Sequence, residues 1–256
     1  MGCTNSKTVK LAIVEKPKDT SVNEVDHVKE YYNANENILP NRIRELFQRY
    51  FMQQTAVASV IDLKFINLSG VQIKSLEVIL PYFTEIRAMN LWKTKLGNDG
   101  CIMLAKLFHN FPHLSFLSLA DNRITYQGLS AISDNSSHLK ELEIIELHIN
   151  PYDSEATHVL SSFIGKLTKL RIICLDECEM AGDSLKDFVL SLPNAKELER
   201  ISMDYNFFGE SAGNVLSNVV GKLKKLKKMS IQHTGITQNV QENLRKVYPD
   251  IMFTFN

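Results

Sequence analysis

The side chains in this sequence that could perform chemistry together are a histidine and two aspartates at matched spacing, with a glutamate nearby. His148, Asp176 and Asp204 lie 28 residues apart, and Glu146 precedes the histidine by two positions. If each step reaches the next parallel strand, these groups form a row with a spacing of about 4.8 Å. Such a row could hold a divalent cation or meet an arginine or lysine of a partner. Rigid strands aim their side chains in parallel, so we favour a solvated acidic patch or a charged-partner site over a metal site.

A nucleophilic role for Cys174, close to His148, would turn this row into a hydrolytic site. That chemistry needs a third group to orient the histidine and donors for an oxyanion, and the sequence has no motif for either. We therefore predict that the chain is not an enzyme and has no catalytic residue, metal ion or cofactor.

The first seven residues carry a second kind of chemistry, covalent lipid attachment. Met1-Gly2-Cys3-Thr4-Asn5-Ser6-Lys7 fits the pattern M-G-x-x-x-[ST], which accepts myristate on Gly2 after Met1 is removed. One myristoyl chain alone binds membranes with only about 10⁴ M⁻¹, so stable anchoring needs a second signal. Cys3 lies where a second acyl chain is commonly added. The segment resembles the dual-acylated N-termini of Src-family kinases and G-protein α subunits. We expect a lipid anchor at the cytoplasmic face of a membrane, with the plasma membrane as first choice; the alternative is a chance match.

A repeat of constant period positions the row of reactive side chains. Its apolar positions are clearest in Leu114-Ser-Phe-Leu117-Ser-Leu119-Ala-Asp-Asn122-Arg-Ile124, which fits L-x-x-L-x-L-x-x-N/C-x-L. The first position recurs every 28 residues, at Ile86, Leu114, Leu142, Leu170, Leu198 and Leu226. We place one earlier repeat at Leu63-Lys-Phe-Ile66-Asn-Leu68, 23 residues before Ile86. A turn and an apolar helical stretch follow each strand-like segment, so the pattern predicts one strand and one helix per repeat.

These residues resemble the leucine-rich repeats of the ribonuclease-inhibitor-like class, whose repeat has 28 residues, over roughly positions 63–255. The resemblance implies an α/β solenoid, an arc or horseshoe with a parallel inner sheet of about seven to eight strands and with outer helices. It also implies a concave strand face that binds other proteins. The class includes activators of the Ran GTPase and the actin-capping tropomodulins, but no stretch of this sequence singles out either.

Motif positions three, five and seven should line the concave face, because successive side chains of a strand point to opposite sides. Position three is apolar in five repeats where solvent favours polar residues, and Trp92, the only tryptophan, lies beside it. The alternative is that an internal segment of the chain covers these side chains. We predict that a protein partner is bound by Phe65, Trp92, Phe116, Ile144, Glu146, His148, Ile172, Asp176, Arg200, Asp204 and Lys228.

The pattern divides the chain into a lipidation motif at 1–7, a linker at 8–39, an N-terminal capping helix at 40–58 and repeats at 59–256. The helix is expected from one apolar stripe, formed by Ile43, Leu46, Phe47, Tyr50 and Phe51. An end repeat needs its open core covered, so we favour a cap over a membrane-surface or calmodulin-binding helix. The segment after Tyr248 is expected to close the other end as a half-repeat.

Composition narrows the class of protein further. The 29 Lys and Arg residues balance 29 Asp and Glu residues, which argues against a nucleic-acid binder. No apolar run is long enough for a membrane-spanning helix or a secretory signal, so we expect a reducing compartment and free thiols at the four cysteines. Together these features predict a monomeric, membrane-anchored adaptor that binds a protein on its concave face. The alternatives are a regulator of a small GTPase or of actin filaments, or a host-acylated pathogen effector.

Overall fold

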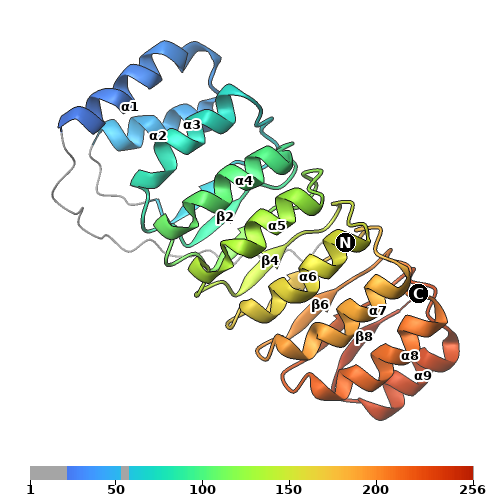
Figure 1. Cartoon of the computed structure of the whole chain (residues 1–256). Helices are drawn as coiled ribbons and strands as arrows, with labels where there is room; N and C mark the ends of the chain where they lie inside the picture. Colours follow the sequence, from blue (N-terminus) through green and yellow to red (C-terminus); the bar gives the residue numbers. More distant parts are fainter. Residues whose placement is uncertain (1–21, 53–57, 256) are drawn as a thin grey trace.

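The computed structural model describes residues 22–52 and 58–255, in which strands and helices alternate from β1 onward (Figure 1). The strands are β1 (Val60–Asp62), β2 (Ala88–Asn90), β3 (Phe116–Ser118), β4 (Ile144–Glu146), β5 (Ile172–Cys174), β6 (Arg200–Ser202), β7 (Lys228–Ser230) and β8 (Met252–Thr254). The α-helices are α1 (Val22–Asn35), α2 (Asn41–Phe51), α3 (Val71–Ile79), α4 (Gly97–Leu107), α5 (Tyr126–Asp134), α6 (Ser154–Lys166), α7 (Gly182–Ser191), α8 (Gly209–Val219) and α9 (Gln238–Val247). Short 3₁₀ helices follow several of them, namely η1 (Glu36–Ile38), η2 (Leu80–Tyr82), η3 (Phe108–Asn110), η4 (Ser136–His138), η5 (Leu192–Asn194) and η6 (Val220–Lys222).

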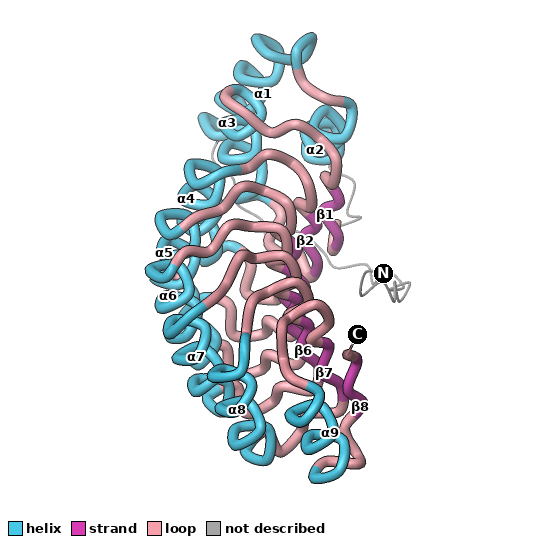
Figure 2. Tube along the Cα trace, turned by 90° about the vertical axis from the view of Figure 1, so that its right-hand side faces the viewer, coloured by secondary structure: helices cyan, strands magenta, loops and turns pink. Residues whose placement is uncertain are grey.

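The strands form one parallel sheet in sequence order, from β1 to β8. From β1 to β7, each residue pairs with the residue 28 positions later, as Leu117 does with Ile145. Figure 2 shows the strands along the inner side of an arc and helices α4 to α8 along its outer side. The fold is a leucine-rich-repeat solenoid, which confirms the fold class predicted from the sequence.

The repeated leucines fill the space between the sheet and the outer helices. In the repeat that contains β3, Leu114, Leu117 and Leu119 are all fully buried, and the same three positions are buried in the following repeats. A helix residue such as Leu129 covers them from the outer side and is itself fully buried. One strand and one helix cannot enclose these side chains alone, so each repeat completes its core against its neighbours.

Buried asparagines at motif position nine join the main chains of consecutive repeats. The Asn122 side-chain Oδ1 accepts hydrogen bonds from the main-chain N–H groups of Thr94 and Leu96, each at 3.0 Å. Its Nδ2 donates to the carbonyl of Leu91 at 2.7 Å and to that of Ala120 at 3.1 Å. Asn150 and Asn206 repeat this pattern one and three repeats later. These side chains satisfy main-chain groups that would otherwise be buried without partners where each strand ends.

The first repeat begins earlier than the sequence predicted. Ile61 of β1 pairs with Met89 of β2, so the step between these repeats is 28 residues and not 23. Leu63 therefore occupies position six, and Ala58 occupies position one and is buried. The prediction was wrong because Leu63, Ile66 and Leu68 imitate the L-x-x-L-x-L spacing, while the true first position holds only a small alanine.

Two helices lie at the N-terminal end of the arc, where the sequence placed only one. Residues 22–35, which we had assigned to the linker, form α1 and contribute Val28 and Tyr32 to the core. The Tyr32 ring lies 5.3 Å from that of Phe47 on α2, and this aromatic contact explains why a polar sequence is helical here. Residues 36–38 of the predicted linker form η1, and residues 8–21 fall outside the described residues. No described helix combines the length and the apolar character needed to cross a membrane.

The C-terminal end of the arc closes with a shorter step. Lys228 of β7 pairs with Met252 of β8, a separation of 24 residues. The rings of Phe253 and Phe255 stack at 5.7 Å, and Arg245 of α9 lies over the Phe255 ring at 4.8 Å. Phe255 belongs to the core and Phe253 packs against it, so the alternating phenylalanines cover the last repeat.

A ladder of ion pairs follows the 28-residue period just before the strands. Arg171 contacts Glu143 at 3.0 Å and Glu199 at 2.9 Å, and Lys227 contacts Glu199 at 2.8 Å. Lys169 and Lys225 make the same kind of contact with Glu141 and Glu197. The hydrogen bonds from Arg171 and Lys227 hold the pKa of Glu199 at about 2, well below its ordinary value. Neighbouring repeats are thus linked at their surface as well as in their core.

Replacing Asn122 with alanine is expected to lower the free energy of unfolding by about 3–5 kcal/mol, because several buried main-chain groups lose their partners at once. Urea titration followed by circular dichroism measures this change. Asn218→Ala is the matched control, since this exposed side chain makes only a local bond to the Asn214 carbonyl. A loss no larger for Asn122→Ala than for the control would contradict the role of the ladder.

The ion pairs of Glu199 predict a pH-dependent stability. Because its pKa is lowered to about 2 in the folded chain, its contribution is complete above the unfolded value of 4.5 and disappears as the pH falls through about 2. At pH 7, Glu199→Gln should lower the free energy of unfolding by about 1 kcal/mol, since exposed pairs are weakened by solvent. Urea titrations between pH 7 and pH 2.5 should show this difference shrinking below pH 4.5. An undiminished difference at pH 2.5 would exclude an electrostatic origin, and Glu177→Gln, which breaks no ion pair, is the control.

Candidate functional site

Motif position three forms a column of side chains along the concave face. Phe116, Ile144 and Ile172 are partly exposed there, while the residues that follow each of them are fully or almost fully buried in the core. Val60 and Ala88 extend the apolar column to β1 and β2. The exposed side chains of Arg200 and Lys228 continue it on β6 and β7. This column is therefore apolar over five strands and basic over the next two.

Phe65 was predicted to belong to this column, and the structure corrects that placement. With the first repeat in its true register, Val60 takes position three and Phe65 takes position eight, in the turn after β1. Phe65 remains a surface residue with 57% of its side chain exposed, and its ring lies 5.0 Å from that of Trp92. It consequently borders the concave face beside Trp92 and does not lie in the apolar column.

Trp92 extends across one complete repeat to reach His148. Their ring centroids are 6.2 Å apart, although the repeat of β3 lies between them. The intervening position-seven residue is Ala120, whose small side chain is fully buried. Alanine at this position leaves room for the indole and imidazole rings to approach each other. Phe65, Trp92 and His148 therefore form one aromatic strip at the edge of the apolar column.

Three buried polar atoms in and beside this strip have no hydrogen-bond partner among the described residues. They are Trp92 Nε1, Ser118 Oγ and His148 Nδ1. Ser118 is position five of β3, so its hydroxyl lies on the concave side of the strand that separates the two rings, and it is fully buried there. An unsatisfied buried polar group costs about 1–3 kcal/mol, which makes three on successive repeats an unusual concentration.

The carboxylates of Asp176 and Asp204 are used within the solenoid. Asp176 Oδ1 accepts hydrogen bonds from Ser202 Oγ at 2.5 Å and from the main-chain N–H of Asp204 at 2.8 Å. Asp204 in turn accepts bonds from Ser230 Oγ at 3.0 Å and from the main-chain N–H of Gln232 at 2.7 Å. Burial raises the pKa of Asp176, and these hydrogen bonds oppose that shift. The predicted acidic row is thus partly a connection between repeats.

Glu146, Arg200 and Lys228 are placed differently from these aspartates. Their side chains make no hydrogen bond or ion pair with any described residue. Glu146 lies on β4 beside the aromatic strip, whereas Arg200 and Lys228 are register partners on β6 and β7. Like charges opposite each other on adjacent strands repel, so this pair of cations weakens the sheet slightly.

Neither Cys101 nor Cys178 is an activated nucleophile. Burial raises the pKa of Cys178 to about 12, and it raises the pKa of Cys101 as well. Cys178 Sγ instead contacts the carbonyl oxygens of Leu147 and Asp176 at 3.5 Å, in the position that asparagine fills in other repeats. In the described ranges, no three His, Cys, Asp or Glu side chains are grouped so that they could bind a metal ion.

Two exposed aromatic residues after β6 escaped the sequence analysis. Tyr205 and Phe207 have 55% and 66% of their side chains exposed, and the Tyr205 ring stacks on that of His233 at 4.5 Å. Phe207 lies so close to Gly235 that a Cβ atom there would be only 3.1 Å from its ring. The signal was available in Tyr205-Asn206-Phe207-Phe208, because only one of two adjacent phenylalanines can enter the core at a turn.

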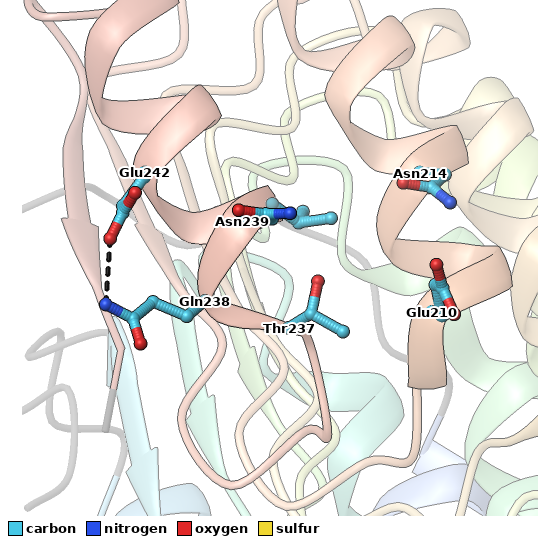
Figure 3. A pocket seen from close by; sticks show the side chains of 7 residues that line it. Glu210, Asn214, Thr237, Gln238, Asn239 and Glu242 are labelled. Carbon is cyan, nitrogen blue, oxygen red and sulfur yellow. Dashed lines mark hydrogen bonds between the residues drawn. The ribbon is translucent and has the colours of Figure 1, made fainter.

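A recess of about 520 Å³ lies between α8 and α9 and is lined by Glu210, Asn214, residues 237–240 and Glu242 (Figure 3). Gln238 Nε2 donates to Glu242 Oε1 at 2.8 Å along α9. The recess belongs to the helical layer, so it contains none of the predicted concave residues. Its polar lining includes no histidine or cysteine for acid–base or nucleophilic chemistry.

No protein-family model matches the chain. It is 26% identical over 192 residues to the Tonsoku-like protein of Mus musculus, covering 70% of this chain and 14% of that protein. It is 24% identical over 171 residues to protein NLRC5 of Homo sapiens, covering 67% of this chain and 9% of that protein. The chain thus spans less than a fifth of the length of these relatives.

Among solved structures, the chain is similar to the C-terminal domain of a Caenorhabditis elegans tropomodulin. The two share 16% sequence identity with a TM-score of 0.46, over 60% of this chain and 93% of that domain. Together, the sheet register, the outer helices and the position-nine asparagines identify the chain as a leucine-rich-repeat solenoid, a fold suited to protein–protein interaction.

Proposed function

We propose that this protein is an adaptor without enzymatic activity, which binds a protein partner on its concave face while acyl chains hold it at the cytoplasmic face of a membrane. The observation that carries the partner-binding part is the apolar column on the concave face, formed by partly exposed side chains from five adjacent strands. A contiguous apolar row on a protein surface is a frequent mark of an interaction site.

The aromatic strip supplies the anchor that such an interface needs. Trp92 combines a large apolar ring with a hydrogen-bond donor, and Phe65 and His148 support it from either side. Tryptophan residues of this kind contribute a disproportionate share of binding free energy when a partner buries them. The column and the strip are adjacent, so one partner segment can contact both.

The membrane part of the proposal rests on the sequence of the first seven residues, which lie outside the described ranges. Gly2 is the acceptor for myristate and Cys3 for a second acyl chain, which supplies the second signal that stable anchoring requires. A solenoid that presents its concave face to the cytoplasm from such an anchor would concentrate its partner at the membrane.

Replacing Gly2 with alanine should release the protein from membranes, because the myristate acceptor is removed. The measurement is fractionation of cells that express the full chain, with the bound fraction expected to fall at least about tenfold. Thr4→Ala is the control, since it leaves the acceptor and Ser6 in place. An unchanged membrane-bound fraction in Gly2→Ala would disprove lipid anchoring and would leave the proposed concave site untouched.

Replacing both Trp92 and Phe116 with alanine should weaken capture of the partner by at least about thirtyfold, as expected when two aromatic anchors are lost. Quantitative affinity capture with the wild-type chain as reference measures this effect. Both rings face the concave side, so the free energy of unfolding should fall by no more than about 2 kcal/mol. Tyr126→Ala, on the outer helix α5, is the control and should leave capture unchanged. A larger loss of stability in the double variant would mean that these rings serve the fold.

A further inference from the structure

We propose that the concave face binds an extended polypeptide segment that is apolar at one end and acidic at the other, with main-chain carbonyl oxygens meeting Trp92, Ser118 and His148. This inference rests on the proposed function and specifies the chemistry of the partner at the same site. Three observations carry it: the buried polar atoms without partners, the pair of cations at the end of the apolar column, and the length of that column.

One of the buried polar atoms requires a hydrogen-bond acceptor, and the other two can use one. Trp92 Nε1 can only donate, while the Ser118 hydroxyl and a neutral His148 ring can each donate one hydrogen. A main-chain carbonyl fits this set better than a carboxylate, because Glu146 and Asp176 place negative charge beside His148. The three atoms lie on successive repeats, and an extended segment offers a carbonyl at every residue.

The three atoms are buried, so binding must move the indole. Trp92 rests against Phe65 and His148, and Ala120 occupies the intervening position of the next repeat. Rotation of its ring would expose Nε1 and the neighbouring groups to a partner. Trp92 is the only tryptophan of the chain, so its fluorescence reports this movement without any label.

The two cations specify the charge at the other end of the segment. Arg200 and Lys228 are opposite each other in register, and no described residue neutralises them. The nearby Lys225 and Lys227 already form ion pairs with Glu197 and Glu199, so they are less available to the carboxylates of a partner. Carboxylates of a partner would relieve the repulsion between Arg200 and Lys228, which gives the acidic end a defined position.

The spacing fixes the length of the segment. Phe116 and Lys228 are four strands apart, a distance of about 19 Å at a strand separation of about 4.8 Å. About six extended residues cover this distance. A polynucleotide fits less well, because the described part of the concave column offers two cations and the carboxylates of Glu146 and Asp176 would repel its phosphates.

The test selects peptides from a random dodecapeptide display library on the full chain. The enriched sequences should contain apolar residues next to at least two Asp or Glu residues. A synthetic peptide of that sequence, blocked at both ends and free of tryptophan, should then change the Trp92 fluorescence with saturation. Selection of no consensus, or of one that lacks acidic residues, would overturn the inference.

Charge reversal sharpens the test. The variant Arg200→Glu with Lys228→Glu should bind the acidic peptide at least about tenfold more weakly and should select basic peptides instead. The matched control, Lys222→Glu with Lys224→Glu, reverses two cations near η6, away from the concave column, and should bind as the wild type does. Thermal unfolding by circular dichroism verifies that both variants are folded. The inferred acidic segment would also be refuted if the wild type and the Arg200/Lys228 variant bound the acidic peptide with equal affinity. Saturation by a single-stranded oligonucleotide in place of the peptide would refute it as well.

The outcome also separates this inference from the function on which it depends. If the Trp92/Phe116 double variant loses its partner but no acidic peptide is enriched, the concave binding site stands and the inferred chemistry is wrong. If the enriched peptide binds that double variant as well as it binds the wild type, both the inference and the concave site are wrong.

Discussion

The structure depends on the satisfaction of main-chain hydrogen bonds where each short strand ends. The strands contain only three residues each, so they cannot hold the sheet by their own ladder alone. Asn122, Asn150 and Asn206 supply the missing donors and acceptors, and they do so across the boundary between repeats. Each asparagine therefore stabilises two repeats together, which helps the concave columns to keep a constant register.

The sequence was sufficient for the central part of this architecture because several independent patterns agree there. From Ile86 to Leu226 the apolar positions, the turn and the helical stretch all recur with one period. At the N-terminal end the patterns disagree. Leu63 to Leu68 imitates a repeat in the wrong frame, and α1 has little apolar periodicity, so its helix depends on contacts of Val28 and Tyr32 that only tertiary structure provides.

The candidate site was predictable at the level of columns but not of contacts. Alternation along a strand places Phe116, Ile144 and Arg200 on the concave face without further information. In contrast, the approach of Trp92 to His148 depends on the small size of Ala120 in the repeat between them and on the side-chain conformations of the two rings. The role of Asp176 was also hidden, because the groups that donate hydrogen bonds to its carboxylate come from the next repeat and not from nearby sequence.

The same period that unites the repeats also separates structural charges from those available for binding. Lys227 and Lys228 are adjacent in sequence, yet Lys227 points to Glu199 in the surface ladder while Lys228 faces Arg200 on the concave side. A carboxylate at position 200 or position 228 would stabilise the solenoid, because it would pair with the remaining cation. Arg200 and Lys228 instead repel each other, on the same concave face that holds the unsatisfied polar atoms. Local conflicts of this kind are expected where a surface serves a partner, because the partner resolves them.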